Sequence, residues 1–176
     1  VQRGNWKGSL FYRRNWKSGW VGEGENQMTK AEKAVDLYGK NFNCSQAVLT
    51  AFAEDFGLSE KLTLSLGTSF GGGARNGQMC GAVSGALMVL GLKFGHFESE
   101  NQEQKSKNYG ISLEFTNRVK EKCGSIVCKE MLNADLTTEE GKAKIAEKNL
   151  FKTLCPKIIA DVVEILEEVI AENSGE

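Results

Sequence analysis

Residues 70–91 read FGGGARNGQMCGAVSGALMVLG, and this stretch decides the expected fold. A glycine-rich loop comes first, and from Cys80 the chain is apolar on all sides through Leu92. A helix without a polar face is typical of a buried element. Glycine permits positive φ angles and a close approach of the backbone to its surroundings. We therefore expect a buried central helix over about residues 80–94, with a loop before it that serves a site.

The segments around this helix carry helical rather than strand patterns. No run alternates apolar and polar residues, and no hairpin signal occurs, so the expected fold class is all-α: a compact multi-helix bundle around the central helix. The strongest single pattern is the amphipathic stretch after Cys155 and Pro156. The expected helices begin at Lys30 after a Thr29–Glu32 capping box, at Cys44 before a stop at Gly57, after Ser59, near Ser99, after Ser125, near Thr138 and at Cys155.

The first 27 residues differ in composition from the rest of the chain. They hold all three tryptophans and five basic residues against two acidic ones, whereas residues 28–176 hold 17 basic and 21 acidic residues. We expect residues 1–27 to be an extension outside the fold and residues 28–176 to form a single helical domain. One interpretation is a start site placed upstream of Met28; the alternative is a basic and aromatic arm for nucleic acid or membrane, which would need cations on a defined face.

Cysteine usage narrows the expected chemistry. No basic-then-apolar leader opens the chain at Val1 or Met28, and no apolar run reaches the ~18 residues of a membrane span, so we expect a cytoplasmic protein with neither membrane span nor nucleic-acid partner. Structural disulfides are unusual in that compartment. Five cysteines then indicate metal binding, catalysis or simple burial.

Four of the cysteines share a position at the start of an expected helix. Cys44, Cys80 and Cys155 stand at helix N-termini, and Cys128 lies in the first turn of another helix. Unpaired N–H groups and the helix dipole favour a thiolate there. There is no C-x-x-C pair, so thioredoxin-like and zinc-ribbon interpretations lose their usual support. Cys123 lies at a helix end, where the dipole disfavours a thiolate, and is the odd one out.

These cysteines and the glycine block resemble the family of redox-active proteins named C-GCAxxG-C-C after its cysteine pattern. The resemblance covers Met28 to the C-terminus and excludes residues 1–27. The central block here reads Cys-Gly-Ala, so its first two letters are in a different order from the family's name. The residues that carry the match are Asn43, Cys44 and Ser45, Gly71 to Gly73 with Arg75 and Gly77, the block Cys80 to Gly85, Cys128 before Met131 and Leu132, and Cys155.

The resemblance implies a small, mostly helical, bacterial-type redox protein. Some members look like the iron-sulfur part of split-Soret cytochromes, which favours a cluster held by Cys44, Cys80, Cys128 and Cys155. Other members carry selenocysteine at a motif cysteine, which favours a reactive thiol. No C-x-x-C-H occurs, so covalent haem is not expected.

Two redox interpretations and one structural interpretation stay open. For an iron-sulfur cluster, Gly72, Gly73 and Gly81 would supply N–H donors beside the sulfurs, with Arg75 pairing with negative charge. For thiol exchange, an oxidoreductase activity, the candidate catalytic residues are Cys80 and Cys44, with Cys80 as the attacker because the loop gives access to it. The alternative is a zinc-stabilised or cofactor-free helical adaptor with buried cysteines.

The remaining candidate residues have weaker support for a functional role. His96 is the only histidine and is expected to be a helix-end turn residue. Tyr38 and Tyr109 are expected in the core or at its rim rather than in catalysis. The redox partner protein or small-molecule substrate is not identified by the sequence, and the small-residue helix surface leaves a homodimer open.

Overall fold

The computed structural model describes residues 28–175, and within that range every regular element is a helix. The all-α prediction is therefore confirmed, while residues 1–27 lie outside the described part. The structure forms α1 (Lys30–Gly39), α2 (Cys44–Ala51), η1 (Ala53–Phe56), α3 (Glu60–Gly67), η2 (Thr68–Phe70), η3 (Gly73–Gly77), α4 (Gly81–Phe94), α5 (Gln102–Cys123), α6 (Cys128–Met131), α7 (Glu139–Glu147), α8 (Leu150–Thr153) and α9 (Cys155–Asn173).

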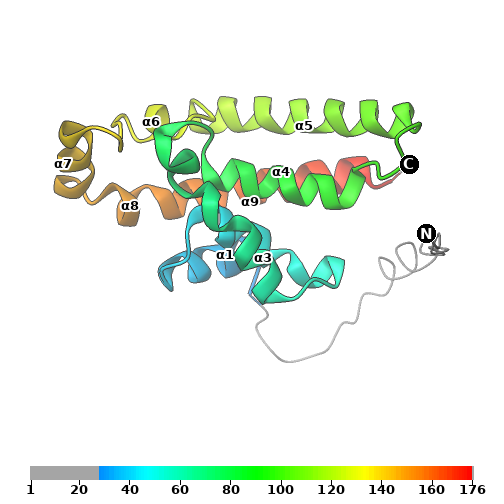
Figure 1. Cartoon of the computed structure of the whole chain (residues 1–176), viewed down its shortest axis with the longest axis horizontal. Coiled ribbons are helices and arrows are strands. Elements are labelled where there is room, and N and C mark those ends of the chain that lie inside the picture. Colours follow the sequence, from blue (N-terminus) through cyan, green and yellow to red (C-terminus); the bar gives the residue numbers. More distant parts are fainter. Residues whose placement is uncertain (1–27, 176) are drawn as a thin grey trace, which may run out of the picture.

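Helix α4 lies in the middle of the bundle. It packs against α2, α5 and α9, and Figure 1 shows α5 running along it on one side while α1 and α3 lie on the other. The short helices α6, α7 and α8 gather at the end where α4 begins. Most of the α4 side chains are buried, as the all-apolar pattern predicts, so the expected central helix is confirmed.

Small residues let α4 approach α2 closely. A β-carbon added at Gly85 would stand 2.8 Å from the carbonyl oxygen of Ser45 and 3.2 Å from the Cβ of Val48. A larger side chain does not fit in that space, so the glycine allows the backbones of the two helices to pack directly against each other. This contact fixes the start of α2 beside the start of α4.

The last helix supplies the largest share of the remaining core. Its predicted apolar face is buried in the structure, together with Ile165. Pro156 occupies the first turn, where its missing N–H costs nothing. The buried residues of α9 that the periodicity identifies are Ile158, Ile159, Val162, Val163, Leu166, Val169 and Ile170.

Three helix boundaries differ from the sequence pattern. The second helix ends at Ala51, and the chain continues to Gly57 as the tighter turn η1. The long helix α5 begins after Asn101, whose side chain accepts from the N–H of Gln104 at 3.0 Å, and it runs through Gly110 without a break. Burial of its Ile111 face against the bundle compensates for the glycine.

The third difference concerns the helix expected after Ser125. The helix begins at Cys128, because residues 126–128 are occupied in an extended contact with the loop before α4. Ser125 instead accepts a hydrogen bond from the N–H of Val127 at 2.9 Å. The local capping signal therefore yields to a long-range backbone pairing.

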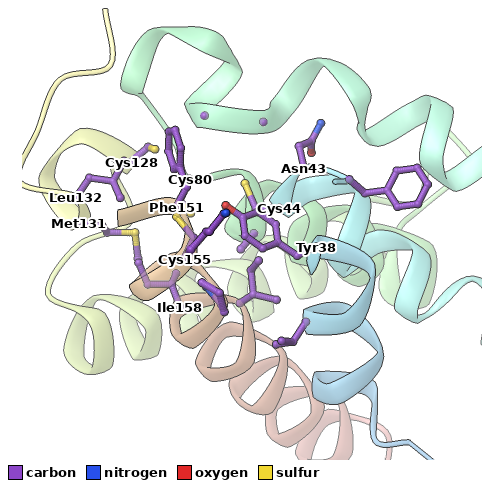
Figure 2. A pocket seen from close by; sticks show the side chains of 18 of the residues that line it. Tyr38, Asn43, Cys44, Cys80, Cys128, Met131, Leu132, Phe151, Cys155 and Ile158 are labelled. Carbon is purple, nitrogen blue, oxygen red and sulfur yellow. The ribbon is translucent and has the colours of Figure 1, made fainter. Parts of the chain in front are cut away.

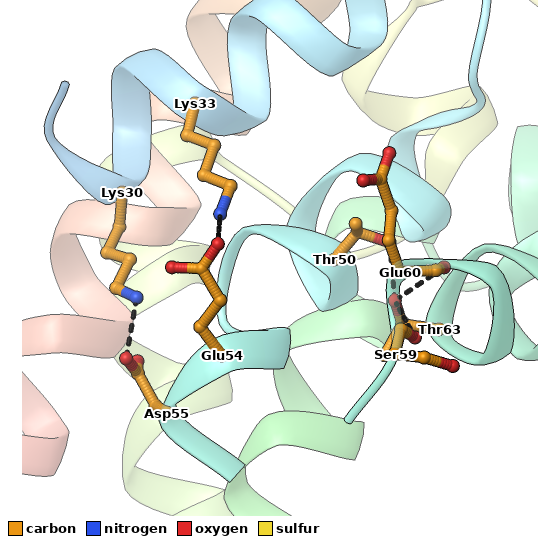
Figure 3. A network of polar contacts seen from close by, with 8 residues as sticks. All are labelled: Lys30, Lys33, Thr50, Glu54, Asp55, Ser59, Glu60 and Thr63. Atoms are coloured by element: carbon orange, nitrogen blue, oxygen red, sulfur yellow. Dashed lines mark hydrogen bonds and ion pairs between the residues drawn. The ribbon is translucent and has the colours of Figure 1, made fainter. Parts of the chain in front are cut away.

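Polar contacts hold α1 against the η1 turn (Figure 3). Lys30 pairs with Asp55 at 2.7 Å and Lys33 pairs with Glu54 at 3.0 Å. Exposed pairs of this kind contribute at most about 1 kcal/mol each. They matter here because α1 carries Tyr38 to the site described below.

Among the described residues, no helix combines the length and the apolar character that crossing a bilayer requires.

Candidate functional site

A pocket of about 580 Å³ opens where the starts of several helices meet (Figure 2). Residues from α1, α2, the glycine loop, α6, α8 and α9 line it. The four cysteines expected at helix starts, Cys44, Cys80, Cys128 and Cys155, all contribute to its wall. Residues far apart in sequence therefore reach one place, as the cysteine interpretation requires.

Cys44 is the first residue of α2, directly after an elaborate cap. The Asn43 side chain accepts from the backbone N–H groups of Ser45 and Gln46, both at 3.0 Å, and the Gln46 side chain accepts from the N–H of Asn43 at 2.9 Å. The Asn43 amide also donates to the carbonyl of Thr68 at 2.9 Å. These bonds fix the start of α2 to the end of α3 and leave Cys44 aimed into the pocket.

The Cys44 thiol is the acidic member of the group. Its pKa is lowered to about 6, first because the Cys80 thiol donates a hydrogen bond to it and then because N–H groups of Gly72, Cys44 and Ser45 point at the sulfur. Burial opposes this shift but does not cancel it. At neutral pH the favoured form of Cys44 is therefore the thiolate.

Cys80 is the N-cap residue of α4 and is only 7% exposed. Its pKa is raised well above the ordinary value, because it serves as the hydrogen-bond donor to Cys44 and because it is buried. The directions of the two pKa shifts thus differ: the pKa of Cys80 is raised and that of Cys44 is lowered, whereas the sequence analysis expected Cys80 to be the attacker.

A single antiparallel bridge brings Cys128 to the same wall. Met79 pairs with Val127, and around this pair the N–H of Cys80 donates to Ile126 at 2.8 Å and the N–H of Cys128 donates to Gln78 at 2.6 Å. Side chains alternate along extended backbone, so Cys80 and Cys128 share one face of the bridge. Burial and the negative charge of neighbouring cysteines raise the pKa of Cys128 to about 12.

Cys155 opens α9 and lines the pocket together with Tyr38, whose hydroxyl acts on the pKa of its thiol. Burial raises the pKa of Cys155 to about 11, although the hydrogen bond from Tyr38 acts in the opposite direction. The pKa of Tyr38 is itself raised, chiefly by burial and then by Cys155. Figure 2 shows Tyr38 between Cys44 and Cys155 in the pocket.

Tyr38 and Lys152 line the pocket although the sequence pattern does not identify either as a site residue. Tyr38 was expected in the core or at its rim, and no local motif marks a tyrosine at the end of a helix as a thiol partner. Its place depends on α1 packing across α2 and α9, which the sequence pattern does not specify. Tyr109, in contrast, is 61% exposed on α5 and does not line the pocket.

The glycine loop adopts a rare backbone. Gly72, Gly73, Ala74 and Arg75 are all left-handed, with φ values of 63°, 63°, 53° and 64°. Gly72 and Arg75 line the pocket, whereas Gly73 is buried behind it with Gln78 against its α-carbon. The loop therefore forms one wall of the site, and its left-handed backbone determines which residues reach the pocket.

Gly81 supports the site without lining the pocket. A β-carbon added there would stand 2.5 Å from the Cys44 sulfur and 2.8 Å from the carbonyl oxygen of Phe70. The absence of a side chain lets the sulfur lie against the first turn of α4. Of the residues expected to bind a cofactor, Gly72, Arg75 and Gly81 thus stand at the pocket or at its sulfur.

The residues set aside at the sequence level lie elsewhere. Cys123, at the end of α5, packs beside the core away from the pocket, and burial followed by the Asp161 carboxylate raises its pKa. His96 is exposed after the end of α4 and does not line the pocket either. Neither residue contributes to the candidate site.

The four thiols supply a donor set for a metal or a cluster, but they are not arranged as ligands. Within residues 28–175, no group of three or more histidine, cysteine, aspartate or glutamate side chains is placed to hold a metal ion. The pKa shifts instead couple the sulfurs in smaller groups: Cys80 is the main cause of the lowered pKa of Cys44, and Tyr38 acts on the pKa of Cys155.

Comparison with known proteins gives one match. A family model described as "Putative redox-active protein (C_GCAxxG_C_C)" matches residues 42–169. The matched range contains the four pocket cysteines and begins four residues after Tyr38. No curated protein and no solved structure matches the chain.

Proposed function

From the premise that this chain belongs to the C_GCAxxG_C_C family of redox-active proteins, we propose that it performs two-electron thiol-disulfide exchange through Cys44 and Cys80. The observation that carries the proposal is that the Cys44 sulfur lies against Gly81, the residue after Cys80, while both cysteines line the same pocket. One thiolate and one adjacent thiol are what the reaction requires.

The proposed reaction begins at Cys44. Its thiolate attacks one sulfur of a substrate disulfide, the S–S bond breaks, and the departing sulfur leaves as a thiolate. Cys80 then gives up its proton to solvent or to the leaving group and attacks the Cys44 sulfur, which releases the second substrate thiolate. The substrate disulfide is reduced by two electrons, and the protein gains a Cys44–Cys80 disulfide.

The surroundings of Cys44 support the attacking role. Backbone N–H groups at the start of α2 and at Gly72 stabilise the thiolate, and Cys44 is the less buried of the two residues. Cys80 is held beside it by the bridge to residues 126–128 and by the start of α4. Cys128 and Cys155, with raised pKa values, stay protonated at neutral pH.

The experiment is an oxidation of the reduced protein by a small disulfide, followed by peptide mapping. The proposal expects a Cys44–Cys80 disulfide in the wild-type protein and a mixed disulfide trapped on Cys44 in Cys80→Ser. Cys44→Ser should form neither product, while Cys123→Ser should behave as wild type. A disulfide that maps mainly to another pair would overturn the proposal, and circular dichroism of each variant separates loss of chemistry from loss of fold.

An iron-sulfur cluster, or a zinc ion, in the pocket is the second candidate. The observation that favours it is that Cys44, Cys80, Cys128 and Cys155 line the same pocket. A cluster would supply electron transfer, and the side chains would have to turn toward a common centre to hold it. Stoichiometric iron and acid-labile sulfide in an anaerobic preparation, lost in Cys155→Ser, would favour the cluster over thiol exchange.

A further inference from the structure

The charge at the pocket differs from that of the chain as a whole. The chain carries 22 basic and 23 acidic residues, yet the charged residues that line the pocket within residues 28–175, besides the Cys44 thiolate, are Arg75 and Lys152, both basic. Neither cation forms an ion pair with an acidic residue in the described part of the chain. Two unpaired cations at the mouth of a pocket favour an anionic occupant.

Arg75 is held at the pocket by a backbone that is unfavourable for its side chain. Arg75 and Ala74 are both left-handed, a conformation that non-glycine residues adopt rarely and that persists only when neighbouring structure imposes it. Packing supplies that constraint, because the Leu136 side chain lies against Gly72 and the Lys129 side chain lies against Gly77. Strained residues of this kind gather at ligand sites.

The body of the pocket is apolar. Val35, Phe42, Leu132, Phe151 and Ile158 contribute side chains to its wall, and its volume of about 580 Å³ falls within the range of small-molecule sites. A ligand that fills this space therefore has an apolar part against these side chains. Its anionic part is expected near Arg75 and Lys152.

We propose that the substrate of the thiol pair is a low-molecular-weight disulfide with an apolar body and an oxyanion group, and that Arg75 and Lys152 bind that oxyanion. This inference rests on the proposed exchange at Cys44. Binding of the oxyanion by these two basic side chains places the disulfide for attack by the Cys44 thiolate. The same positive charge stabilises the thiolate that leaves. Arg75 is the better suited of the two for a carboxylate, because guanidinium offers paired donors.

The test compares two aromatic disulfides that report the reaction by their colour. One, dithiobis-nitrobenzoate, carries carboxylates, and the other, dithiodipyridine, is neutral. The measured quantity is the ratio of their Cys44-dependent rates, obtained by stopped flow in a Cys123→Ser background. The neutral probe serves as the control for any change in the thiolate itself.

Arg75→Gln and Lys152→Gln should each lower the anionic-to-neutral ratio by about three- to tenfold, the range of a partly screened charge contact. Raising the salt concentration should shrink the wild-type preference in the same direction. The matched control is Lys157→Gln, because Lys157 is exposed near the start of α9 but does not line the pocket. Its ratio should equal that of the wild type.

The outcomes separate the two proposals. Equal ratios in the wild type, Arg75→Gln and Lys152→Gln would overturn the substrate inference and leave thiol exchange standing. If neither probe reacts in a way that depends on Cys44, the exchange itself fails. A ratio that falls equally in Lys157→Gln would also overturn the inference, because the effect would then be one of general charge.

Discussion

The sulfur of Cys44 lies against the backbone of Gly81, so that a β-carbon added at Gly81 would stand 2.5 Å from it. The two residues belong to different helices, α2 and α4, and each is at or near the start of its helix. The thiolate of Cys44 and the Cys80 thiol are adjacent because of this close approach. The geometry of the site therefore depends on having glycine, with no side chain, at position 81 as well as on the cysteines.

Replacement of Gly81 by alanine tests that relationship. The added methyl group meets the Cys44 sulfur and the Phe70 carbonyl, so we expect Gly81→Ala to destabilise the fold by about 1–3 kcal/mol. The displaced sulfur should also lose part of its hydrogen bond from Cys80. Urea unfolding measures the first effect, and the pH dependence of Cys44 alkylation measures the second.

The control for this variant lies in the same helix. Gly91 is exposed, and nothing stands within 4 Å of an added β-carbon. Gly91→Ala should therefore stabilise the protein by about 0.5–1 kcal/mol through helix propensity. Two alanine variants with the same sign would contradict the packing argument.

The reactivity of Cys44 should follow its lowered pKa. Alkylation of Cys44 in the wild type should rise with pH around a midpoint of about 6, since only the thiolate reacts. In Cys80→Ala the main cause of the lowered pKa is gone, so the midpoint should move upward and the rate at pH 7 should fall by about tenfold. Mass spectrometry of the alkylated peptide follows Cys44 alone, and Cys123→Ala should leave the midpoint in place.

Tyr38 should act on Cys155 through its hydroxyl. Tyr38→Phe removes the hydrogen bond that lowers the pKa of Cys155, so that pKa, already about 11, should rise further. Alkylation of Cys155 at alkaline pH should slow, and stability should fall by about 1 kcal/mol for the lost bond. Tyr109→Phe is the matched control because Tyr109 is exposed on α5; an equal change in both variants would remove the role of Tyr38.

The left-handed loop can be tested at Gly73. In Gly73→Ala the new side chain would be left-handed and would also meet the Gln78 nitrogen at 2.5 Å. Gly124 is left-handed too, but an added β-carbon there meets nothing within 4 Å. We expect Gly73→Ala to cost about 1–3 kcal/mol more than Gly124→Ala in urea unfolding, because overpacking adds to backbone strain.

The same variant should disturb the cysteines. The Gln78 carbonyl accepts from the N–H of Cys128 at 2.6 Å, so a shift of Gln78 moves the bridge that joins Cys80 to Cys128. Alkylation of Cys80 and Cys128 in the native protein should become faster in Gly73→Ala and stay unchanged in Gly124→Ala. Unchanged protection in both would mean that the loop and the bridge are independent.

Much of the fold follows from local patterns. The apolar run after Cys80 predicts the central helix, and the capping box at Thr29 and Glu32 forms as expected. The helix after Ser125 begins two residues later than its cap predicts, because the chain there pairs with the loop at Met79. Local signals fail where a distant backbone competes for the same N–H groups.

The sequence by itself identified the candidate site: four cysteines at helix starts and a glycine loop before the central helix, which the structure brings to one pocket. It did not determine which thiol has the lowered pKa, nor that Tyr38 and Lys152 line the same pocket as the cysteines. Those features depend on which groups face each sulfur across helix contacts. Because the pKa of a thiol is set by its hydrogen-bond partners, its burial and neighbouring charges, only the tertiary structure assigned the thiolate to Cys44 and the proton to Cys80.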